Sequence, residues 1–472
     1  MVVGELVQEK ELVVVGGGPA GYTAAIRAAQ LGKEVVIIEK EKIGGVCLNK
    51  GCVPSKTLVH AAKQSGRLQK MKELGFLFDD PSFELSTYHQ YKNNIIDNLR
   101  KGVMALCKAH KIEIITGKAY FLDHERIGVE NGHQYETIKF SQAIIAAGAY
   151  IKEDETNRML SSYQLFNPEN LPGKLLLIGW NYLVLEAAFA YSGLGCDVTV
   201  LATRDDSGFL DAEIEKELIR LLKKRKIDLH LDVKNIRWHI SNNLIECTFN
   251  NANGERREVT GTHIYSQEEI RGNTDGLGVS RLGVELDDQG FIVVDEQCRT
   301  NRGGIFAIGD VTGPPLLAVK GIRQGKTAAE IACGKTGEVD MTWMPTVIHT
   351  DPPIAFSGFT ESEAKEAGFT IKTGVFPLTA NGYASLTQNK EGMAKVVFDD
   401  QSDRLLGVHF IGEGAVELIS SAVLGLEMGA RDEDFLFPFY PHPSTSESLL
   451  EAVEQMKGLA IHQPPKKLKQ KA

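Results

Sequence analysis

Two cysteines, Cys47 and Cys52, lie close together in the run Gly-Gly-Val-Cys-Leu-Asn-Lys-Gly-Cys-Val-Pro-Ser-Lys at residues 44–56. Their spacing is about one turn of helix, which would bring two sulfurs together on one face. Adjacent sulfurs form and break a disulfide, so the pair predicts redox exchange with a thiol. Half of a zinc site and two unrelated buried thiols are the alternatives. A zinc half-site normally has a spacing of roughly two to four residues and a second pair elsewhere, which the sequence lacks.

A base for this chemistry is found near the C-terminal end, where His442 is followed by Pro443 and, five residues on, by Glu447. Thiol exchange needs the thiolate, and an imidazole near a cysteine removes the proton and supplies positive charge. A carboxylate at the other ring nitrogen fixes the tautomer and strengthens the base. We therefore expect His442 and Glu447 to act as an acid–base pair. The alternative is an ordinary surface histidine.

The elements that position the cysteines begin with a nucleotide-binding pattern. Residues 11–39 read as strand, glycine turn, Ala-rich helix and strand, the first unit of a dinucleotide-binding fold. Gly16 allows the sharp turn, Gly18 lets the backbone approach a pyrophosphate, and Gly21 allows the helix to pack closely on the strand. The helix N-terminus then presents free N–H groups to the phosphates. Glu39 ends the second strand, where a carboxylate accepts hydrogen bonds from a ribose diol.

Together, the glycine turn and the cysteine run resemble the flavoprotein disulfide reductases of the pyridine nucleotide-disulfide oxidoreductase family. Cys-Leu-Asn after Gly-Gly-Val is more similar to dihydrolipoyl dehydrogenases than to glutathione reductases. The resemblance covers nearly the whole chain and implies bound FAD, with Cys47 exchanging with substrate and Cys52 contacting the flavin. It also implies that His442 and Glu447 act on the disulfide of the opposite subunit, and hence an obligate head-to-tail homodimer.

The same resemblance assigns further flavin contacts. Residues 305–311 read Ile-Phe-Ala-Ile-Gly-Asp-Val and are similar to the second FAD signature, a strand that ends in Gly309 and Asp310. In the family, that aspartate holds the ribityl chain. Gly148 ends the return strand close to the flavin, with Ala147 in place of the family's threonine.

Other positions match the surroundings of the flavin ring. Lys56 and Glu186 correspond to an ion pair near the reactive ring, although Glu186 could instead be an ordinary acid on a helix face. Tyr182 corresponds to the residue that commonly gates the nicotinamide pocket. Val319 stands where the family has a histidine.

A second strand–turn–helix pattern begins at Lys174, but its glycines are missing. Where the family has Gly-x-Gly-x-x-Gly or Ala, residues 179–184 read Gly-Trp-Asn-Tyr-Leu-Val. Asn181 puts a side chain where the backbone should touch a pyrophosphate, and Val184 crowds the helix against the strand. The next strand is followed by Ala202, in place of the acid that holds the ribose in NAD-binding relatives.

These changes leave two outcomes for NAD(P). Binding of the nucleotide is lost or badly weakened, or the loop accommodates it by a different path. Arg204 would suit the phosphate of NADP, and Arg271 and Asn273 keep part of the family's stretch beside the nicotinamide. Trp180 either fills the nicotinamide pocket or faces solvent. NAD(P) is therefore uncertain as a cofactor, whereas FAD is expected.

The expected fold class is α/β, with two Rossmann-like dinucleotide-binding domains, one for FAD and one of NAD(P) type, and a C-terminal α+β dimerisation domain. Residues 1–150 are expected to form the first part of the FAD-binding domain, with the redox disulfide, and residues 273–340 its second part. Residues 151–272 would form the degenerate NAD(P)-type domain, and residues 341–472 the dimerisation domain.

Composition limits the class of protein. The 472 residues are 43% hydrophobic and 24% charged, ordinary values for a globular protein. The formal net charge of -10 argues against nucleic-acid binding. We expect no signal peptide, membrane helix or metal site, and the scattered cysteines suit a reducing, cytoplasmic compartment.

The predicted function is that of an FAD-dependent dithiol–disulfide oxidoreductase resembling dihydrolipoyl dehydrogenase. Electrons would pass between a small dithiol or a lipoyl-domain substrate, the disulfide of Cys47 and Cys52, and FAD. A disulfide oxidoreductase with a protein or another non-nicotinamide electron partner is the alternative. A non-catalytic FAD-bearing scaffold is disfavoured because both cysteines, His442 and Glu447 are intact.

Overall fold

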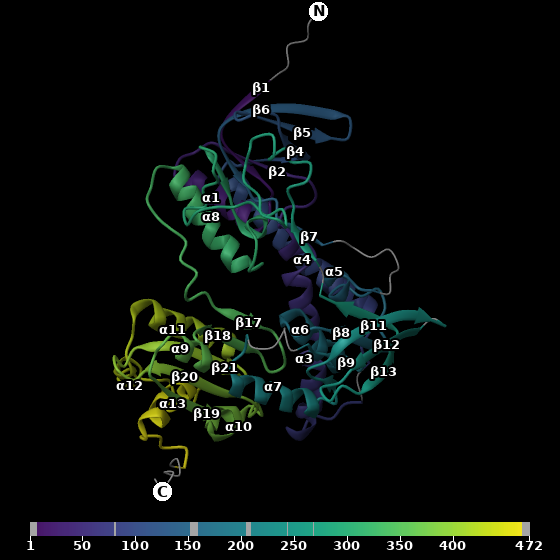
Figure 1. The fold of residues 1–472 in the computed structure, drawn as a ribbon, viewed down its shortest axis with the longest axis vertical. Helices are drawn as coiled ribbons and strands as arrows, with labels where there is room; N and C mark the ends of the chain where they lie inside the picture. The colour runs from purple at the N-terminus through teal and green to yellow at the C-terminus, as the bar shows by residue number, and fades with distance from the viewer. Residues whose placement is uncertain are drawn as a thin grey trace, which may run out of the picture.

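The computed structural model describes residues 7–79, 82–151, 159–203, 209–242, 244–267 and 269–464, so Arg204 lies outside the described residues. The upper unit in Figure 1 contains β1 (Val7–Val15), the first described strand of the chain. Below it lie a second α/β unit and a C-terminal unit that ends with α13 (Glu447–Lys457), side by side (Figure 1).

The upper unit is built on a mostly parallel sheet, as the first glycine pattern predicts. β1 is followed by α1 (Pro19–Gln30) and β2 (Val35–Glu39), and the sheet has the order β3-β2-β1-β6-β5-β4. β16 (Ile305–Ala307) returns from far along the chain and pairs in parallel with β6. The remaining strands are β3 (Glu113–Thr116), β4 (Lys118–Phe121), β5 (Arg126–Asn131) and β6 (Gln134–Ile145).

Helices pack on this sheet and carry the cysteines. α1 lies beside α8 (Ala318–Ala332), and the two approach so closely that a Cβ on Gly325 would come 2.6 Å from the carbonyl oxygen of Ala20. The 3₁₀ helix η2 (Gly309–Thr312) precedes α8. The cysteine run forms α2 (Gly45–Asn49) and the start of α3 (Cys52–Glu73), and α4 (Leu85–Ala109) follows.

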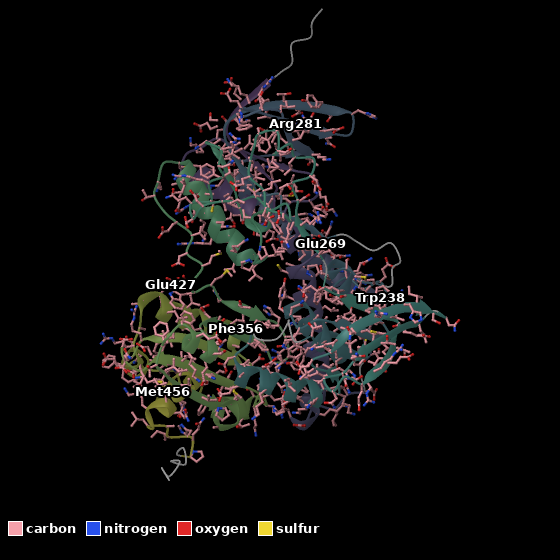
Figure 2. All side chains as sticks on the ribbon, viewed as in Figure 1. Trp238, Glu269, Arg281, Phe356, Glu427 and Met456 are labelled. Carbon is pink, nitrogen blue, oxygen red and sulfur yellow. The ribbon has the colours of Figure 1, made fainter. Side chains whose placement is uncertain are left out.

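The second unit repeats the parallel plan on a smaller scale. Its sheet has the order β10-β9-β8-β14, and a separate antiparallel sheet, β11-β12-β13, carries Trp238 away from the other units (Figure 2). The strands are β8 (Lys174–Ile178), β9 (Asp197–Leu201), β10 (Asp228–His230), β11 (Lys234–Ser241), β12 (Leu244–Asn250), β13 (Arg256–Gly261) and β14 (His263–Ser266). The helices are α5 (Ser162–Leu165), α6 (Tyr182–Gly193) and α7 (Ala212–Lys224). β7 (Ala149–Ile151) and β15 (Ile270–Gly272) pair where the chain enters and leaves this unit.

The C-terminal unit is an antiparallel sheet of order β17-β18-β21-β20-β19, covered by helices. Its strands are β17 (Thr346–Ile348), β18 (Ile354–Gly358), β19 (Ile371–Pro377), β20 (Met393–Asp399) and β21 (Leu405–Ile411). Its helices, besides α13, are α9 (Glu361–Glu366), η3 (Leu378–Ala380), α10 (Gly382–Leu386), α11 (Ala415–Met428) and α12 (Asp432–Leu436). Two parallel sheets with helices and a C-terminal α+β unit confirm the expected α/β fold class.

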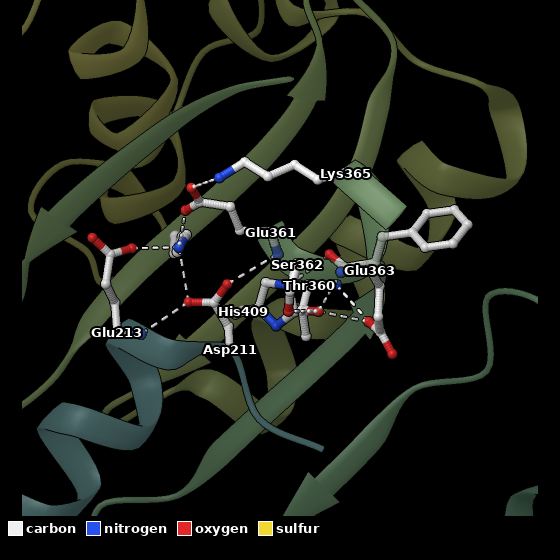
Figure 3. A network of polar contacts seen from close by, with 10 residues as sticks. Asp211, Glu213, Thr360, Glu361, Ser362, Glu363, Lys365 and His409 are labelled. Atoms are coloured by element: carbon white, nitrogen blue, oxygen red, sulfur yellow. Dashed lines mark hydrogen bonds and ion pairs between the residues drawn. The ribbon is translucent and has the colours of Figure 1, made fainter. Parts of the chain in front are cut away.

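A buried lysine joins the second unit to the C-terminal unit. Lys395 of β20 is 1% exposed, and its Nζ lies 2.8 Å from Asp211 and 2.9 Å from Glu361, with Glu213 as a third carboxylate partner. Figure 3 shows these acids converging from α7 and from the start of α9. The ring of Phe356 lies 6.4 Å from that of Phe209 at the same junction (Figure 2). The two units therefore pack as one body around a fully satisfied charge.

Within the described ranges, none of the helices combines the length and the apolar character that crossing a membrane requires.

Candidate active site

A cavity of about 1130 Å³ lies at the carboxyl ends of β1 and β2, the edge where ligands bind in open parallel sheets. Most of the predicted flavin contacts line it: Gly16, Gly18, Glu39, Cys47, Cys52, Lys56, Gly148, Gly309 and Asp310. Gly21 and Glu186 lie behind this lining. Among the described residues, those that line the cavity do not include His442 and Glu447.

The glycine turn at the start of α1 leaves no room for side chains. A Cβ on Gly16, whose φ is +107°, would lie 2.2 Å from the carbonyl oxygen of Ala146, and one on Gly21 would lie 1.9 Å from that of Gly16. Gly18 is the N-cap of α1 and, being glycine, leaves the first N–H groups of the helix uncapped by a side chain. This cradle fits the pyrophosphate of a dinucleotide, because Gly18, Pro19 and Ala20 at the uncapped N-terminus of α1 line the cavity and helix N-termini bind phosphates.

Glu39 is held in place for a ribose diol. The backbone N–H of Gly17 donates to its Oε2 at 2.7 Å, and the N–H of Glu41 donates to its Oε1 at 2.8 Å. Each carboxylate oxygen accepts more than one hydrogen bond, so both retain capacity toward the cavity.

Asp310 lines the cavity at the start of η2, and burial raises the pKa of its carboxyl group. Gln324 of α8 accepts a hydrogen bond from the N–H of Gly309 at 2.7 Å and fixes this turn. Lys320, one turn before Gln324, is buried and donates to the carbonyl oxygen of Gly313. Gln324 is not among the site residues predicted from the sequence, although its spacing of one helical turn from Lys320 is a usable signal. Val319, the departure from the family motif, is 44% exposed.

The two cysteines do not share a continuous helix, so the first geometric expectation was wrong. α2 ends at Asn49 and α3 begins at Cys52, with Gly51 between them at φ -118° and ψ -101°. A step of five residues along an unbroken helix turns the side chain by about 500°, well off the original face. The break between the two helices is what turns the sulfurs toward each other.

The thiols of Cys47 and Cys52 are neighbours, and each shifts the pKa of the other. The bond from Cys47 and the charge of Lys56 lower the pKa of Cys52, whereas the bond to Cys52 and burial raise the pKa of Cys47. Cys52 is also the first residue of α3, where the helix dipole favours an anion. These surroundings therefore favour the thiolate form at Cys52 and the protonated form at Cys47.

Lys56 lies one turn into α3 and pairs with Glu186 of α6. Its Nζ is 2.9 Å from Oε1 and 2.8 Å from Oε2 of Glu186, which is fully buried. The backbone N–H of His349 donates to the same carboxylate at 2.9 Å. Glu186 is thus bonded to groups from both α3 and the C-terminal unit, which sequence spacing alone does not indicate.

The second glycine turn is closed by the chain's own side chains. Oδ1 of Asn181, the N-cap of α6, accepts a hydrogen bond from the N–H of Val184 at 3.1 Å. Trp180 is 1% exposed and belongs to the same hydrophobic core as Val184, so it does not face solvent. Ala202 is 2% exposed, and its N–H donates to the carbonyl oxygen of His230 at 2.9 Å. At the positions where the first unit would hold a nucleotide, the second unit has other residues or backbone groups that are already hydrogen-bonded within the chain.

Of the three residues that the family resemblance places beside the nicotinamide, two line the cavity and one does not. Tyr182 and Asn273 line the cavity, and burial raises the pKa of Tyr182. Asn273 donates to the carbonyl oxygen of Ala147 at 2.9 Å. Arg271 instead turns to Glu269, at 2.7 Å (Glu269 is labelled in Figure 2).

His442 and Glu447 meet as predicted but lie on the C-terminal unit. Nδ1 of His442 is 2.8 Å from Oε1 of Glu447, and the N–H of Ser444 donates to Oε2 at 2.8 Å. The His442 side chain is 79% exposed. Burial raises the pKa of Glu447, but its bonds to His442 and Ser444 outweigh this and leave it lowered. One chain alone does not bring this pair to the cysteine cavity.

Family comparisons agree with this architecture. Residues 10–325 match the model of the pyridine nucleotide-disulphide oxidoreductases, and residues 344–453 match the dimerisation domain of the same enzymes. The chain belongs to the pyridine nucleotide-disulphide oxidoreductase family. As a member, it is an enzyme, an FAD-dependent disulfide oxidoreductase, and its dimerisation domain supports a homodimer.

Individual family members cover the chain from end to end. A dihydrolipoyl dehydrogenase of Staphylococcus aureus is 35% identical over 467 residues, 98% of this chain and 100% of that protein. One of Geobacillus stearothermophilus is 35% identical over 476 residues, 98% of this chain and 99% of that protein. The similarity confirms the resemblance inferred from the cysteine and glycine motifs.

Solved structures share the fold. LpdA of Mycobacterium tuberculosis superposes with a TM-score of 0.85 at 24% identity and covers 95% of this chain and 100% of its own. The HOCl-induced flavoprotein disulfide reductase RclA of Escherichia coli, as a Cu(II) complex, superposes with a TM-score of 0.84 at 24% identity, covering 95% and 99%.

Proposed function

We propose that this enzyme exchanges two electrons between a small dithiol or a lipoyl group and its Cys47–Cys52 disulfide, with FAD as the internal acceptor and without a nicotinamide nucleotide. The observation that carries the proposal is the contrast between the two glycine turns. The first is an open cradle beside the cysteines, whereas Asn181 caps the second. The electron partner beyond the flavin would then be a protein or another non-nicotinamide carrier.

The proposed exchange consists of two successive thiol–disulfide exchange steps. His442 takes the proton of the first substrate thiol, whose sulfur attacks Cys47 and forms a mixed disulfide while Cys52 leaves as the thiolate. The second substrate thiol then attacks the substrate sulfur of the mixed disulfide. As Cys47 leaves, His442 gives it the proton taken from the first thiol and then accepts the proton of the second thiol. The substrate is released as a disulfide, and its two electrons remain on the cysteine pair.

The surroundings of Cys52 favour it as the leaving sulfur. Lys56 and the N-terminus of α3 stabilise the thiolate as it leaves. Gly16, Gly18, Glu39, Gly148 and Asp310 would hold FAD in the shared cavity. When bound, FAD supplies the two-electron acceptor for the reduced pair.

The base is expected to come from a second copy of the chain. His442 is exposed on the C-terminal unit and does not line the cavity of its own chain. A homodimer built on the dimerisation domain would place each His442 and Glu447 at the cysteines of the partner. We infer a cytoplasmic location, because the scattered positions of the other cysteines suit a reducing compartment.

Replacing Cys47 by Ser tests the assignment directly. Turnover of dihydrolipoamide should fall at least a thousandfold while FAD stays bound, since the nucleophile is lost but the cradle is untouched. Cys333→Ser, at the far end of α8, is the matched control and should keep full turnover. Dithiol turnover that survives the Cys47 substitution would exclude this sulfur as the exchanging one.

A further inference from the structure

A second histidine–carboxylate pair lies beside the first on α13. Glu447 and Glu451 are four residues apart, so their side chains lie on one face of the helix. Glu447 binds Nδ1 of His442, and Glu451 binds Nδ1 of His462, which follows the helix. The two pairs therefore lie one helical turn apart.

The second pair is built into the fold. The Glu451 side chain is 7% exposed, and within the described residues its Oε2 atom is buried without a hydrogen-bond partner. Gln463, the next residue after His462, donates to the carbonyl oxygen of Val375 at 3.1 Å. Val375 in turn donates its N–H to Gln455 of α13 at 3.1 Å. The segment after α13 is thus fixed to β19 next to the bond between His462 and Glu451.

The two pairs act on each other electrostatically. The bond to Glu451 raises the pKa of His462, and Glu447 and Glu454 add to this effect. In the other direction, the charge of His462 contributes to the lowered pKa of Glu447. Glu447, Glu451, Glu454 and His442 are the titratable groups that face this cluster from α13 and the loop before it.

We propose that His462 and Glu451 are positioning residues that set the electrostatic field at Glu447 and thereby the strength of His442 as the base of dithiol exchange. This inference rests on the proposed function of His442. In its protonated form, which the bond to Glu451 favours, His462 places a positive charge near Glu447, whereas the carboxylate of Glu451 places a negative one there. One positive and one negative side chain, His462 and Glu451, thus lie near the carboxylate of Glu447 that binds the base.

The test uses two nearly isosteric substitutions of opposite charge effect. His462→Asn keeps a donor for Glu451 but removes the positive charge, so His442 should hold its proton more strongly. The acid limb of kcat/KM for dihydrolipoamide oxidation should move to higher pH by about 0.3–1 unit, a twofold to tenfold loss of rate on that limb. Glu451→Gln removes the negative charge and also the bond that raises the pKa of His462, so the same limb should move to lower pH by a smaller amount.

pH shifts of opposite sign in the two variants distinguish an electrostatic effect on His442 from a loss of local structure. Both substitutions weaken the same contact, so a purely structural role predicts equal shifts or none, and either result would overturn the inference. Thermal unfolding of the FAD-loaded dimer checks that each variant folds. His442→Gln tests the role of His442 separately from that of His462 and Glu451. If that variant keeps wild-type turnover, the proposed function of His442 fails. If it loses turnover and the paired shifts are absent, only the role of His462 and Glu451 fails.

Discussion

Oδ1 of Asn181 lies 3.1 Å from the backbone nitrogen of Val184, where it occupies the helix terminus that a pyrophosphate would need. At the equivalent place in the first unit stands Gly18, which has no side chain to do so. Two units with the same strand–turn–helix backbone are thus chemically opposite. One turn is open to a dinucleotide and the other is closed by its own cap.

Asn181 should behave as a stability residue. Asn181→Ala removes the N-cap of α6 and should lower the free energy of unfolding by about 1 kcal/mol, measured by denaturant titration. Asn181→Asp keeps the acceptor and should retain most of that stability. If the Ala variant were as stable as the wild type but differed in its reaction with NADH, Asn181 would be a nucleotide contact instead.

Lys56 should matter more than its neighbours on α3. Lys56→Met leaves the fully buried carboxylate of Glu186 without its countercharge, at a cost of about 2–4 kcal/mol in unfolding free energy. The double substitution Lys56→Met, Glu186→Gln should recover part of this loss. Lys63→Met is the control, because its partner Glu413 keeps Arg67 at 3.0 Å and the loss there should be under about 1 kcal/mol. Equal losses for Lys56 and Lys63 would contradict this ranking.

The junction around Lys395 predicts a specific acid sensitivity. Hydrogen bonds from Lys365 and Lys395 lower the pKa of Glu361 from 4.5 to about 2, and Lys395 also contributes to the lowered pKa of Asp211. A depressed carboxyl pKa stabilises the fold above the unfolded value, and this stabilisation disappears as pH falls through the folded value. Denaturation midpoints of the wild type should therefore decrease as pH falls from about 4.5 toward 2.

Removing the lysine should flatten that dependence. Lys395→Met leaves Asp211 buried and unpaired, so the variant should be less stable at neutral pH and lose less on acidification. Lys365→Met is the comparison: it removes only the part of the acid dependence that comes from Glu361, and because its side chain is 58% exposed and Asp211 stays paired, stability at neutral pH should change little. A steeper acid dependence in the Lys395 variant than in the wild type would refute the assignment.

Local rules account for the parts of the site that could be predicted from the sequence. Gly16, Gly21 and Glu39 were found because a glycine turn, its helix and its acid follow fixed spacings within one unit. His442 and Glu447 were found from their chemistry and from the family resemblance. The helix break at Gly51 is not predicted from the sequence, because the five-residue spacing of the two cysteines is interpreted there as about one turn of a continuous helix.

Long-range contacts account for most of what was missed. Lys395 meets Asp211 across 184 positions of sequence, and no local pattern marks that pairing. The burial of Trp180 follows from the core that α6 shares with α7, which the motif alone does not describe. In each case the deciding partner comes from another element, so spacing along the chain carries no signal.

We propose that dithiols, and not nicotinamide nucleotides, exchange electrons with this enzyme. Anaerobic mixing of the FAD-loaded protein with dihydrolipoamide, NADH or NADPH in separate experiments, with the visible absorbance of the flavin as the readout, distinguishes the two. We expect rapid loss of the oxidised-flavin absorbance with dihydrolipoamide and none with either nucleotide. Rapid bleaching by NADH or NADPH would show that the enzyme accepts electrons from a nicotinamide nucleotide.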